Sequence, residues 1–307
     1  GKRRTVYSAI MPIEILDIAS DGRVLLAAQR TERDTTALLA GDKEPRTLVV
    51  PGESSIVRTM TPDGRLVVVT NQIPDGYEHF LIRSDRVGAV RLGAGENMSI
   101  SPDGAWSLAS TPGFDKFSVT PTGMGPTRDV PNPGGLTYLS LPVWLPDAKR
   151  FVAIARKGSD APRAYIFDAT TGVATAFGPP LLDWRFFGGP PVSTDGREVV
   201  LQDERSAMVR VPIGGGDPTP IPGMFPDDWP LSYTEDGKGL FVAERKLPIE
   251  VARVDFATGS RVPWLTMAPT RTAGMRYWVP VITPNGKYWA LCTGKLLTTL
   301  FVVEGLR

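Results

Sequence analysis

Apolar and polar residues alternate in short runs along the whole chain, and turn residues separate the runs. Ile56–Met60 and Leu66–Val69 flank one such turn, and Ile13–Ile18 and Val24–Ala27 flank another. A period of two is typical of β-strands that are buried on one face. The pattern therefore predicts an all-β protein made of many short antiparallel strands.

One turn motif recurs seven times. Its copies are Ser20-Asp21-Gly22, Thr61-Pro62-Asp63-Gly64, Ser101-Pro102-Asp103-Gly104, Leu145-Pro146-Asp147-Ala148, Ser193-Thr194-Asp195-Gly196, Glu235-Asp236-Gly237 and Thr283-Pro284-Asn285-Gly286. The acidic or amide position falls at 21, 63, 103, 147, 195, 236 and 285, so the spacings are 42, 40, 44, 48, 41 and 49 residues. Spacings of this size are typical of the blades of a β-propeller.

The motif has the chemistry of a turn between two strands. Proline presets φ at the first turn position, and Asp or Asn followed by Gly supplies the positive φ of a tight turn. A second turn signal follows each copy by about half a repeat. It is seen at Gly41-Asp42, Thr122-Gly123, Thr171-Gly172, Gly214–Gly216 and Thr258-Gly259. Two turns of this kind in each repeat predict four strands per blade.

The predicted fold is a single domain over residues 1–307, a seven-bladed β-propeller with four-stranded antiparallel blades. The last repeat, Tyr277–Leu306, has room for three strands. We expect the N-terminal strand Arg4–Ala9 to supply the fourth and close blade seven. A six-bladed ring is the alternative, and it would place one copy, Asp147-Ala148, in an insertion.

Composition supports a folded chain with dense turns. The 307 residues include 32 Gly and 29 Pro, and 42% are apolar. The 34 Lys and Arg balance 33 Asp and Glu, so overall charge favours neither nucleic acid nor an anionic membrane. A single cysteine excludes a disulfide within the chain, and a single histidine excludes sites that need two imidazoles.

Familiar catalytic motifs are not found. The sequence has no Gly-x-Ser-x-Gly elbow, no phosphate-binding Gly-x4-Gly-Lys-Ser/Thr loop and no His-Glu-x-x-His pair. We expect His79 and Cys292 to be structural, because neither has a partner at a catalytic spacing. The turn carboxylates are spread over separate repeats, so we expect no metal site and no cofactor.

In a propeller the strand before each Asp-Gly turn is innermost, and its start lies on the face opposite those turns. We expect that face to bind a protein, a peptide or a small ligand, because aromatic residues and both charge signs meet there. The candidate residues are Glu53, Glu96, Tyr138, Arg185, Asp227, Asp228, Trp229, Arg276 and Tyr277. A propeller hydrolase, like a glycosidase or lactonase, is the alternative, and Glu53, Glu96, Asp227 and Asp228 are its candidate carboxylates.

The Ser/Thr-Pro-Asp-Gly turns at blade spacing resemble the TolB-type, WD-like β-propeller repeat. The stretch from Val209 resembles the C-terminal propeller of bacterial eukaryotic-type serine/threonine kinases and related winged-helix regulators. The residues that carry this likeness are Val211–Gly216, Asp255–Gly259 and the ending Val303-Glu304-Gly305-Leu306. The resemblance implies an extracytoplasmic, periplasmic sensor domain of a bacterial membrane protein, with a cytoplasmic location as the alternative. Kinase motifs do not occur in the chain, so the resemblance implies no kinase activity here.

Overall fold

The structure, a computed structural model, describes residues 13–49, 52, 55–73, 76–111, 116–181, 188–244, 246–269 and 272–304. These residues form strands and turns, with no helix among them. The strands are β1 (Ile13–Ile18), β2 (Val24–Leu38), β3 (Arg46–Thr47), β4 (Ser55–Met60), β5 (Leu66–Ile73), β6 (Gly76–Arg83), β7 (Ala89–Ala94), β8 (Glu96–Ile100), β9 (Trp106–Ser110), β10 (Phe117–Pro121), β11 (Arg128–Val130), β12 (Leu136–Tyr138), β13 (Val143–Trp144), β14 (Arg150–Lys157), β15 (Arg163–Asp168), β16 (Ala174–Phe177), β17 (Glu198–Gln202), β18 (Met208–Pro212), β19 (Thr219–Pro220), β20 (Asp228–Tyr233), β21 (Gly239–Glu244), β22 (Ile249–Asp255), β23 (Arg261–Met267), β24 (Met275–Ile282) and β25 (Trp289–Val303).

The described strands form six antiparallel sheets, here named A to F. Sheet A contains β24, β25, β2 and β3 in that order, and β1 pairs with the first residues of β2 along the same edge as β3. Sheets B, C and F are the meanders β4 to β7, β8 to β11 and β20 to β23. Sheet D contains β12 to β16, and sheet E contains β17 to β19 together with a bridge between Val192 and Val199. The predicted all-β class is confirmed.

Apolar clusters join each sheet to the next and close a ring. Five of them lie between A and B, C and D, D and E, E and F, and F and A. Val68 and Leu81 of sheet B pack with Ile100 of sheet C across the sixth junction. Strands that are buried on both faces carry continuous apolar runs, as β14 does from Phe151 to Ala155.

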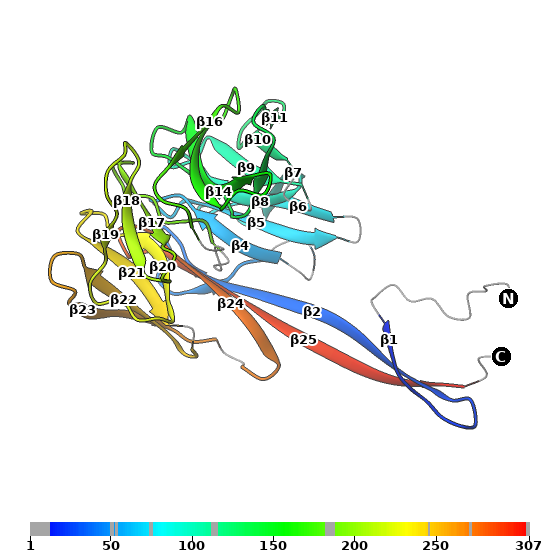
Figure 1. Ribbon diagram of the computed structural model, residues 1–307. Coiled ribbons are helices and arrows are strands. Elements are labelled where there is room, and N and C mark those ends of the chain that lie inside the picture. Colours follow the sequence, from blue (N-terminus) through cyan, green and yellow to red (C-terminus); the bar gives the residue numbers. More distant parts are fainter. Residues whose placement is uncertain are drawn as a thin grey trace.

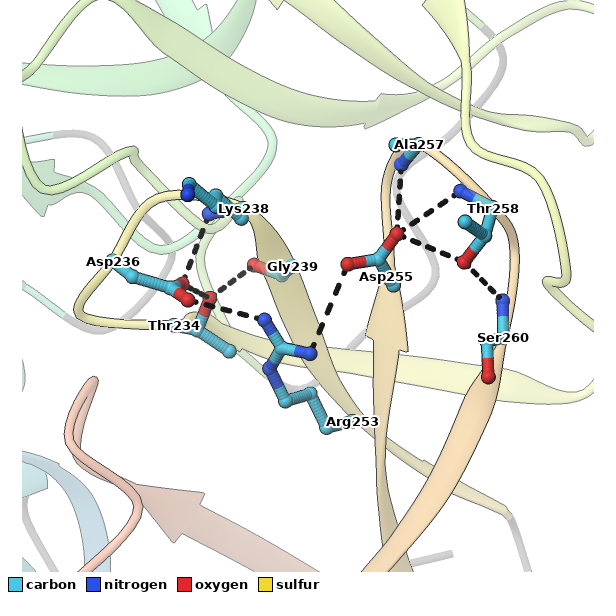
Figure 2. A network of polar contacts seen from close by, with 9 residues as sticks. All are labelled: Thr234, Asp236, Lys238, Gly239, Arg253, Asp255, Ala257, Thr258 and Ser260. Carbon is cyan, nitrogen blue, oxygen red and sulfur yellow. Dashed lines mark hydrogen bonds and ion pairs between the residues drawn. The ribbon is translucent and has the colours of Figure 1, made fainter.

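The turn chemistry explains why the sequence folds in this way. In sheet F the Oγ1 of Thr234 donates a hydrogen bond of 2.5 Å to Asp236, and the backbone N–H of Lys238 donates one of 3.0 Å to the same carboxylate. These two bonds hold the pKa of Asp236 below its usual value. Figure 2 shows Arg253 reaching from Asp236 to Asp255, which caps the next turn of the same sheet. Arg253 therefore links the turn at Asp236 to the turn at Asp255 through ion pairs with both carboxylates.

The predicted seven blades are not confirmed. The Asp147 copy, which the six-blade alternative places in an insertion, joins β13 to β14 inside sheet D. The copy that lies outside the ring is Asp21-Gly22, at the turn between β1 and β2. The reason is a long-range pairing: β2 runs beside β25 from Val24↔Val303 to Leu38↔Trp289. The predicted closing strand Arg4–Ala9 lies outside the described residues.

One part of the chain projects from the ring. We call residues 13–30 and 297–303 the arm; it consists of β1, the first half of β2 and the second half of β25. Figure 1 shows β2 and β25 running together away from the other sheets, with β1 beside them. Seven large apolar side chains of the arm are exposed, namely Ile13, Ile15, Leu16, Ile18, Leu300, Phe301 and Val302.

Candidate functional site

A cavity of about 200 Å³ lies at the centre of the ring. Residues from all six sheets line it. Examples from sheets A to F, in order, are Pro280, Arg58, Ser99, Trp144, Val192 and Ser232. The innermost strands β4, β8, β13, β20 and β24 supply most of the wall. The cavity is smaller than the roughly 300–1,000 Å³ of sites for drug-sized ligands. It therefore suits a small group or a single extended peptide segment.

Prolines give the wall an unusual chemistry. Pro230 and Pro280 lie within the innermost strands β20 and β24 and face the cavity. An innermost strand is the edge of its sheet, so proline can occupy it without removing a ladder hydrogen bond. Beyond the cavity, at the Asp-Gly face, a second hollow is lined by the residue that precedes the Asp or Asn of each ring turn, namely Pro62, Pro102, Pro146, Thr194, Glu235 and Pro284. Because proline has no N–H, hydrogen-bond donors are scarce along this path.

Arg58 is the charged residue among the described side chains that line the cavity. The pairing of β4 with β5 skips one residue between Val57 and Thr59, so Arg58 is the extra residue of a β-bulge. Bulges re-aim side chains and are frequent beside functional sites. The Nη2 of Arg58 donates a 2.5 Å hydrogen bond to Glu96 at the start of β8, and both side chains are nearly buried. The ion pair joins sheets B and C at the cavity.

Trp144 also lines the cavity. It ends β13, is 3% exposed and lines both the cavity and the hollow at the Asp-Gly face. Its backbone N–H donates to the hydroxyl of Ser99 at 3.4 Å. Its indole Nε1–H has no acceptor among the described residues. A buried donor without a partner costs free energy, and an acceptor that enters the cavity would recover it once the indole turns toward the cavity.

Of the residues predicted from sequence, Glu96 and Trp229 lie at this site. Glu96 holds Arg58, and Trp229 lines the cavity while packing against Ile56, Val279 and Cys292. Sequence reasoning missed Arg58 and Trp144. The available signal for Arg58 was a single charge inside the otherwise uncharged inner strand Ser55–Met60.

The two neighbouring aspartates of the prediction differ in environment. Asp227 is exposed in the turn before β20, whereas Asp228 is 1% exposed. The guanidinium of Arg261 donates to both oxygens of Asp228, at 2.6 and 3.0 Å, and the backbone N–H of Phe225 donates at 2.7 Å. Asp228 therefore anchors the start of β20 to β23.

Tyr138 packs in the core between sheets C and D. Its ring stacks on Phe117 with centroids 4.0 Å apart, and burial raises the pKa of its hydroxyl to about 12. Arg276 is exposed at a bulge of β24, beside Tyr277, whose backbone pairs with Gly294. Glu53 and Arg185 lie outside the described residues.

His79 and Cys292 are both fully buried. The Nδ1–H of His79 donates to the carbonyl of Gly95 at 3.3 Å, and burial lowers the pKa of the imidazole to about 4. Burial likewise raises the pKa of the Cys292 thiol. Across the described part of the chain, no group of three or more His, Cys, Asp or Glu side chains has a geometry that could hold a metal ion. The same residues contain no helix that is long and apolar enough to cross a membrane.

Comparison with solved structures identifies the fold. A protein assigned as TolB from Agrobacterium tumefaciens matches with a TM-score of 0.59 and 16% identity, over 87% of this chain and 99% of that one. TolB from Acinetobacter baumannii matches with a TM-score of 0.51 and 15% identity, over 88% of this chain and 66% of that one. The fold is a TolB-type β-propeller. Neither a protein-family model nor a curated protein matches the sequence.

Enzymes share this fold as well. An oligogalacturonate lyase in complex with manganese matches with a TM-score of 0.52 and 12% identity, over 94% of this chain and 96% of that one. A propeller is a scaffold on which unrelated functions occur. The fold alone therefore does not define the function of this chain.

Proposed function

We propose that this chain is a non-enzymatic binding domain whose central cavity receives a short peptide segment or a small ligand. The observation that carries the proposal is that Arg58 lines the same cavity as Trp144, whose buried indole N–H has no acceptor among the described residues. Two donors in a proline-rich wall select a ligand by its acceptor atoms. A carboxylate or a peptide carbonyl is the group that fits them.

The ligand enters, in this proposal, from the face opposite the Asp-Gly turns. Trp229 lies in the cavity wall, and the exposed Asp227 and Arg276 lie just before and within the inner strands β20 and β24. Glu53, Tyr277 and Arg185 belong to the same expected surface. The mixed charge of this rim suits a protein or peptide partner better than an apolar ligand.

The resemblance to kinase-linked propellers suggests the setting. We propose that the domain is the extracytoplasmic, sensing part of a bacterial signalling protein, so that occupancy of the cavity would be the signal. Its support is the resemblance of the stretch from Val209 to the C-terminal propellers of such proteins.

A propeller hydrolase is the competing function. A glycosidase needs two carboxyl groups about 5–9 Å apart on either side of a substrate. Glu96 and Asp228, the buried candidates, belong to sheets C and F, and each carboxylate is held by an arginine. These two ion pairs favour the binding role, because the oxygens of a carboxylate that is already bound by an arginine are less available to contact a substrate.

The test is a thermal-shift comparison with two versions of one peptide library, ending in a free carboxylate or in an amide. A ligand that binds only the folded state raises Tm. We expect carboxylate peptides to raise Tm in the native protein and in the surface control Arg83→Gln, but not in Trp144→Phe or Arg58→Gln. Release of product from an oligosaccharide by the protein, abolished by Glu96→Gln, would instead establish the hydrolase.

A further inference from the structure

Exposed apolar side chains lie on both faces of the arm. On one face of its three-stranded sheet lie Ile15, Ile18 and Phe301, and on the other lie Leu300 and Val302, all of them exposed. On the second face they lie beside Glu14 and Asp17 of β1. A strand with one buried face alternates apolar and polar residues, whereas a strand between two packed sheets is apolar on both. The arm therefore has the side chains of a blade that packs between two other blades.

The hairpin of β1 and β2 also has the backbone of a blade. The N–H of Gly22 donates to the carbonyl of Ala19 at 2.9 Å, as Gly64 donates to Thr61, and Asp21 accepts from the N–H of Arg23 as Asp63 does from Arg65. In β1 the extra residue of a bulge, Leu16, lies five positions before Asp21. The bulges of three innermost strands have the same offset, with Arg58 before Asp63, Met98 before Asp103 and Leu231 before Asp236.

β2 and β25 each have the length of two blade strands. Both contain 15 residues, whereas other strands of the ring reach 8. In sheets B and D the second strand ends at Ile73 and Lys157, ten residues after Asp63 and Asp147. Ten residues after Asp21 is Thr31, in the middle of β2. In sheet F the second strand ends at Glu244, eight residues after Asp236. The corresponding position in β25, eight residues after Asn285, is Thr293, which lies inside the strand just before Gly294.

We propose that the arm contains strands of a seventh blade that lies outside the ring, and that the place of this blade is the junction of sheets A and B of the same chain. Insertion requires β2 to fold back at Thr31–Arg33 and β25 to fold back at Thr293–Lys295, so that β1, the two halves of β2 and β3 form the seventh blade and the second half of β25 pairs with its first half in sheet A. β1 then becomes an innermost strand between β24 and β4, which contact each other in the six-sheet ring. The exposed apolar side chains of the arm become buried on both faces, and Leu16 joins the cavity wall.

One backbone hydrogen bond reports which form is present. In five sheets the carbonyl of the residue that follows the turn glycine, or Ala148 in sheet D, accepts a hydrogen bond from the backbone N–H of the residue after the third strand. The acceptor and donor pairs are Arg65–Ser84, Ala105–Thr122, Lys149–Ala169, Arg197–Ile213 and Lys238–Phe256. In the arm the corresponding acceptor is Arg23. The N–H of Ala40, two residues after the end of β2, donates instead to Gly64 of sheet B at 3.0 Å. Folding back brings Ala40 to Arg23 and releases Gly64.

The test is a distance measurement by pulsed electron spin resonance with labels at Arg23→Cys and Lys43→Cys in a Cys292→Ala background. The ends of the extended β2 are about 45 Å apart, at roughly 3.3 Å per residue, whereas folding back brings the two turns to neighbouring strands and the labels to within about 20 Å. We expect a population at the short distance, and that population must survive mixing with excess unlabelled protein. A single distance near 45 Å overturns the proposal. Short distances that vanish on mixing also overturn it, because the arm then docks on a second copy.

Two double variants shift the balance between the extended and the folded-back form of β2 in opposite directions, so the test does not depend on how much of each form the native protein contains. Thr31→Asn with Glu32→Gly creates a two-residue hairpin turn and should increase the short-distance population. Glu32→Val with Arg33→Val favours an extended strand and should decrease it. If the two variants leave the distances equal, β2 does not fold at this point and the proposal fails.

Discussion

Arg58 on β4 donates a 2.5 Å hydrogen bond to Glu96 on β8, and this pair links two sheets at the cavity wall. Both side chains are little exposed, at 12% and 11%. An arginine that is held in this way keeps a fixed position, so its charge is pre-organised for a ligand rather than mobile at the surface.

Substitutions of Arg58 and Glu96 should have non-additive effects on the free energy of unfolding. Arg58→Met or Glu96→Gln alone leaves the other group buried without its partner and should cost about 2–4 kcal/mol. The double variant should cost clearly less than the sum of the two single variants. Urea unfolding of the four proteins measures the coupling. Additive losses would mean that the two side chains act independently.

The turn aspartate should be replaceable by asparagine. Asn285 occupies this position in the last copy and accepts from the Thr283 hydroxyl at 2.8 Å and from the Lys287 N–H at 2.9 Å. In the matching turn Asp103 accepts from Ser101 and Ala105. Asp103→Asn should therefore change the free energy of unfolding by less than about 0.5 kcal/mol, while Asp103→Ala should lose about 1–2 kcal/mol. Equal losses in thermal or urea unfolding would contradict this account of the motif.

Replacement by alanine should destabilise the protein much more at Gly64 than at Gly22, because only Gly64 is closely packed. Gly64 and Gly22 both have positive φ, of 67° and 86°. A Cβ on Gly64 would lie 2.3 Å from the ring of Tyr288, whereas a Cβ on Gly22 meets nothing within 4 Å. Gly22→Ala should cost about 1–2 kcal/mol from backbone strain, and Gly64→Ala at least about 2 kcal/mol more. Similar losses for the two would show that Gly64 does not pack against sheet A in solution.

His79 should make the protein sensitive to mild acid. Burial lowers the pKa of the folded-state imidazole to about 4, against 6.5 for an ordinary histidine. The unfolded chain therefore binds the proton first, so stability is complete above pH 6.5 and falls as the pH drops toward 4, by about 3 kcal/mol in total. Urea unfolding between pH 4 and 7 should show this slope in the native protein and lose it in His79→Leu. An unchanged slope in the variant would assign the effect to other groups.

The local part of the fold was predictable, and the long-range part was not. Asp-Gly and Thr-Gly chemistry acts within four residues, so the sequence revealed the turns at Asp63, Asp103 and Asp236 and the second turns of the sheets. The number of blades depends on whether β2 pairs with β25 or folds on itself. Both arrangements use the same alternating strands, so the pattern alone cannot distinguish them.

The site was predictable only in part. Glu96 and Trp229 were found because they begin innermost strands, and Tyr138 was included on the same ground although its ring packs into a core. Arg58 takes its orientation from a bulge, and Trp144 is notable because its indole N–H lacks an acceptor. Neither property is visible in residue types or spacing.

The most direct test of the proposed function is the indole N–H resonance of Trp144 in a ¹H–¹⁵N spectrum, assigned by its loss in Trp144→Phe. The chain has seven tryptophans, so the other six indoles serve as internal references. Titration with the carboxylate peptide that gives the largest thermal shift should move the Trp144 resonance downfield with the same concentration dependence as Tm, and the amide version should not. A Trp144 signal that stays in place while the peptide raises Tm would show that binding occurs away from the cavity and would contradict the account.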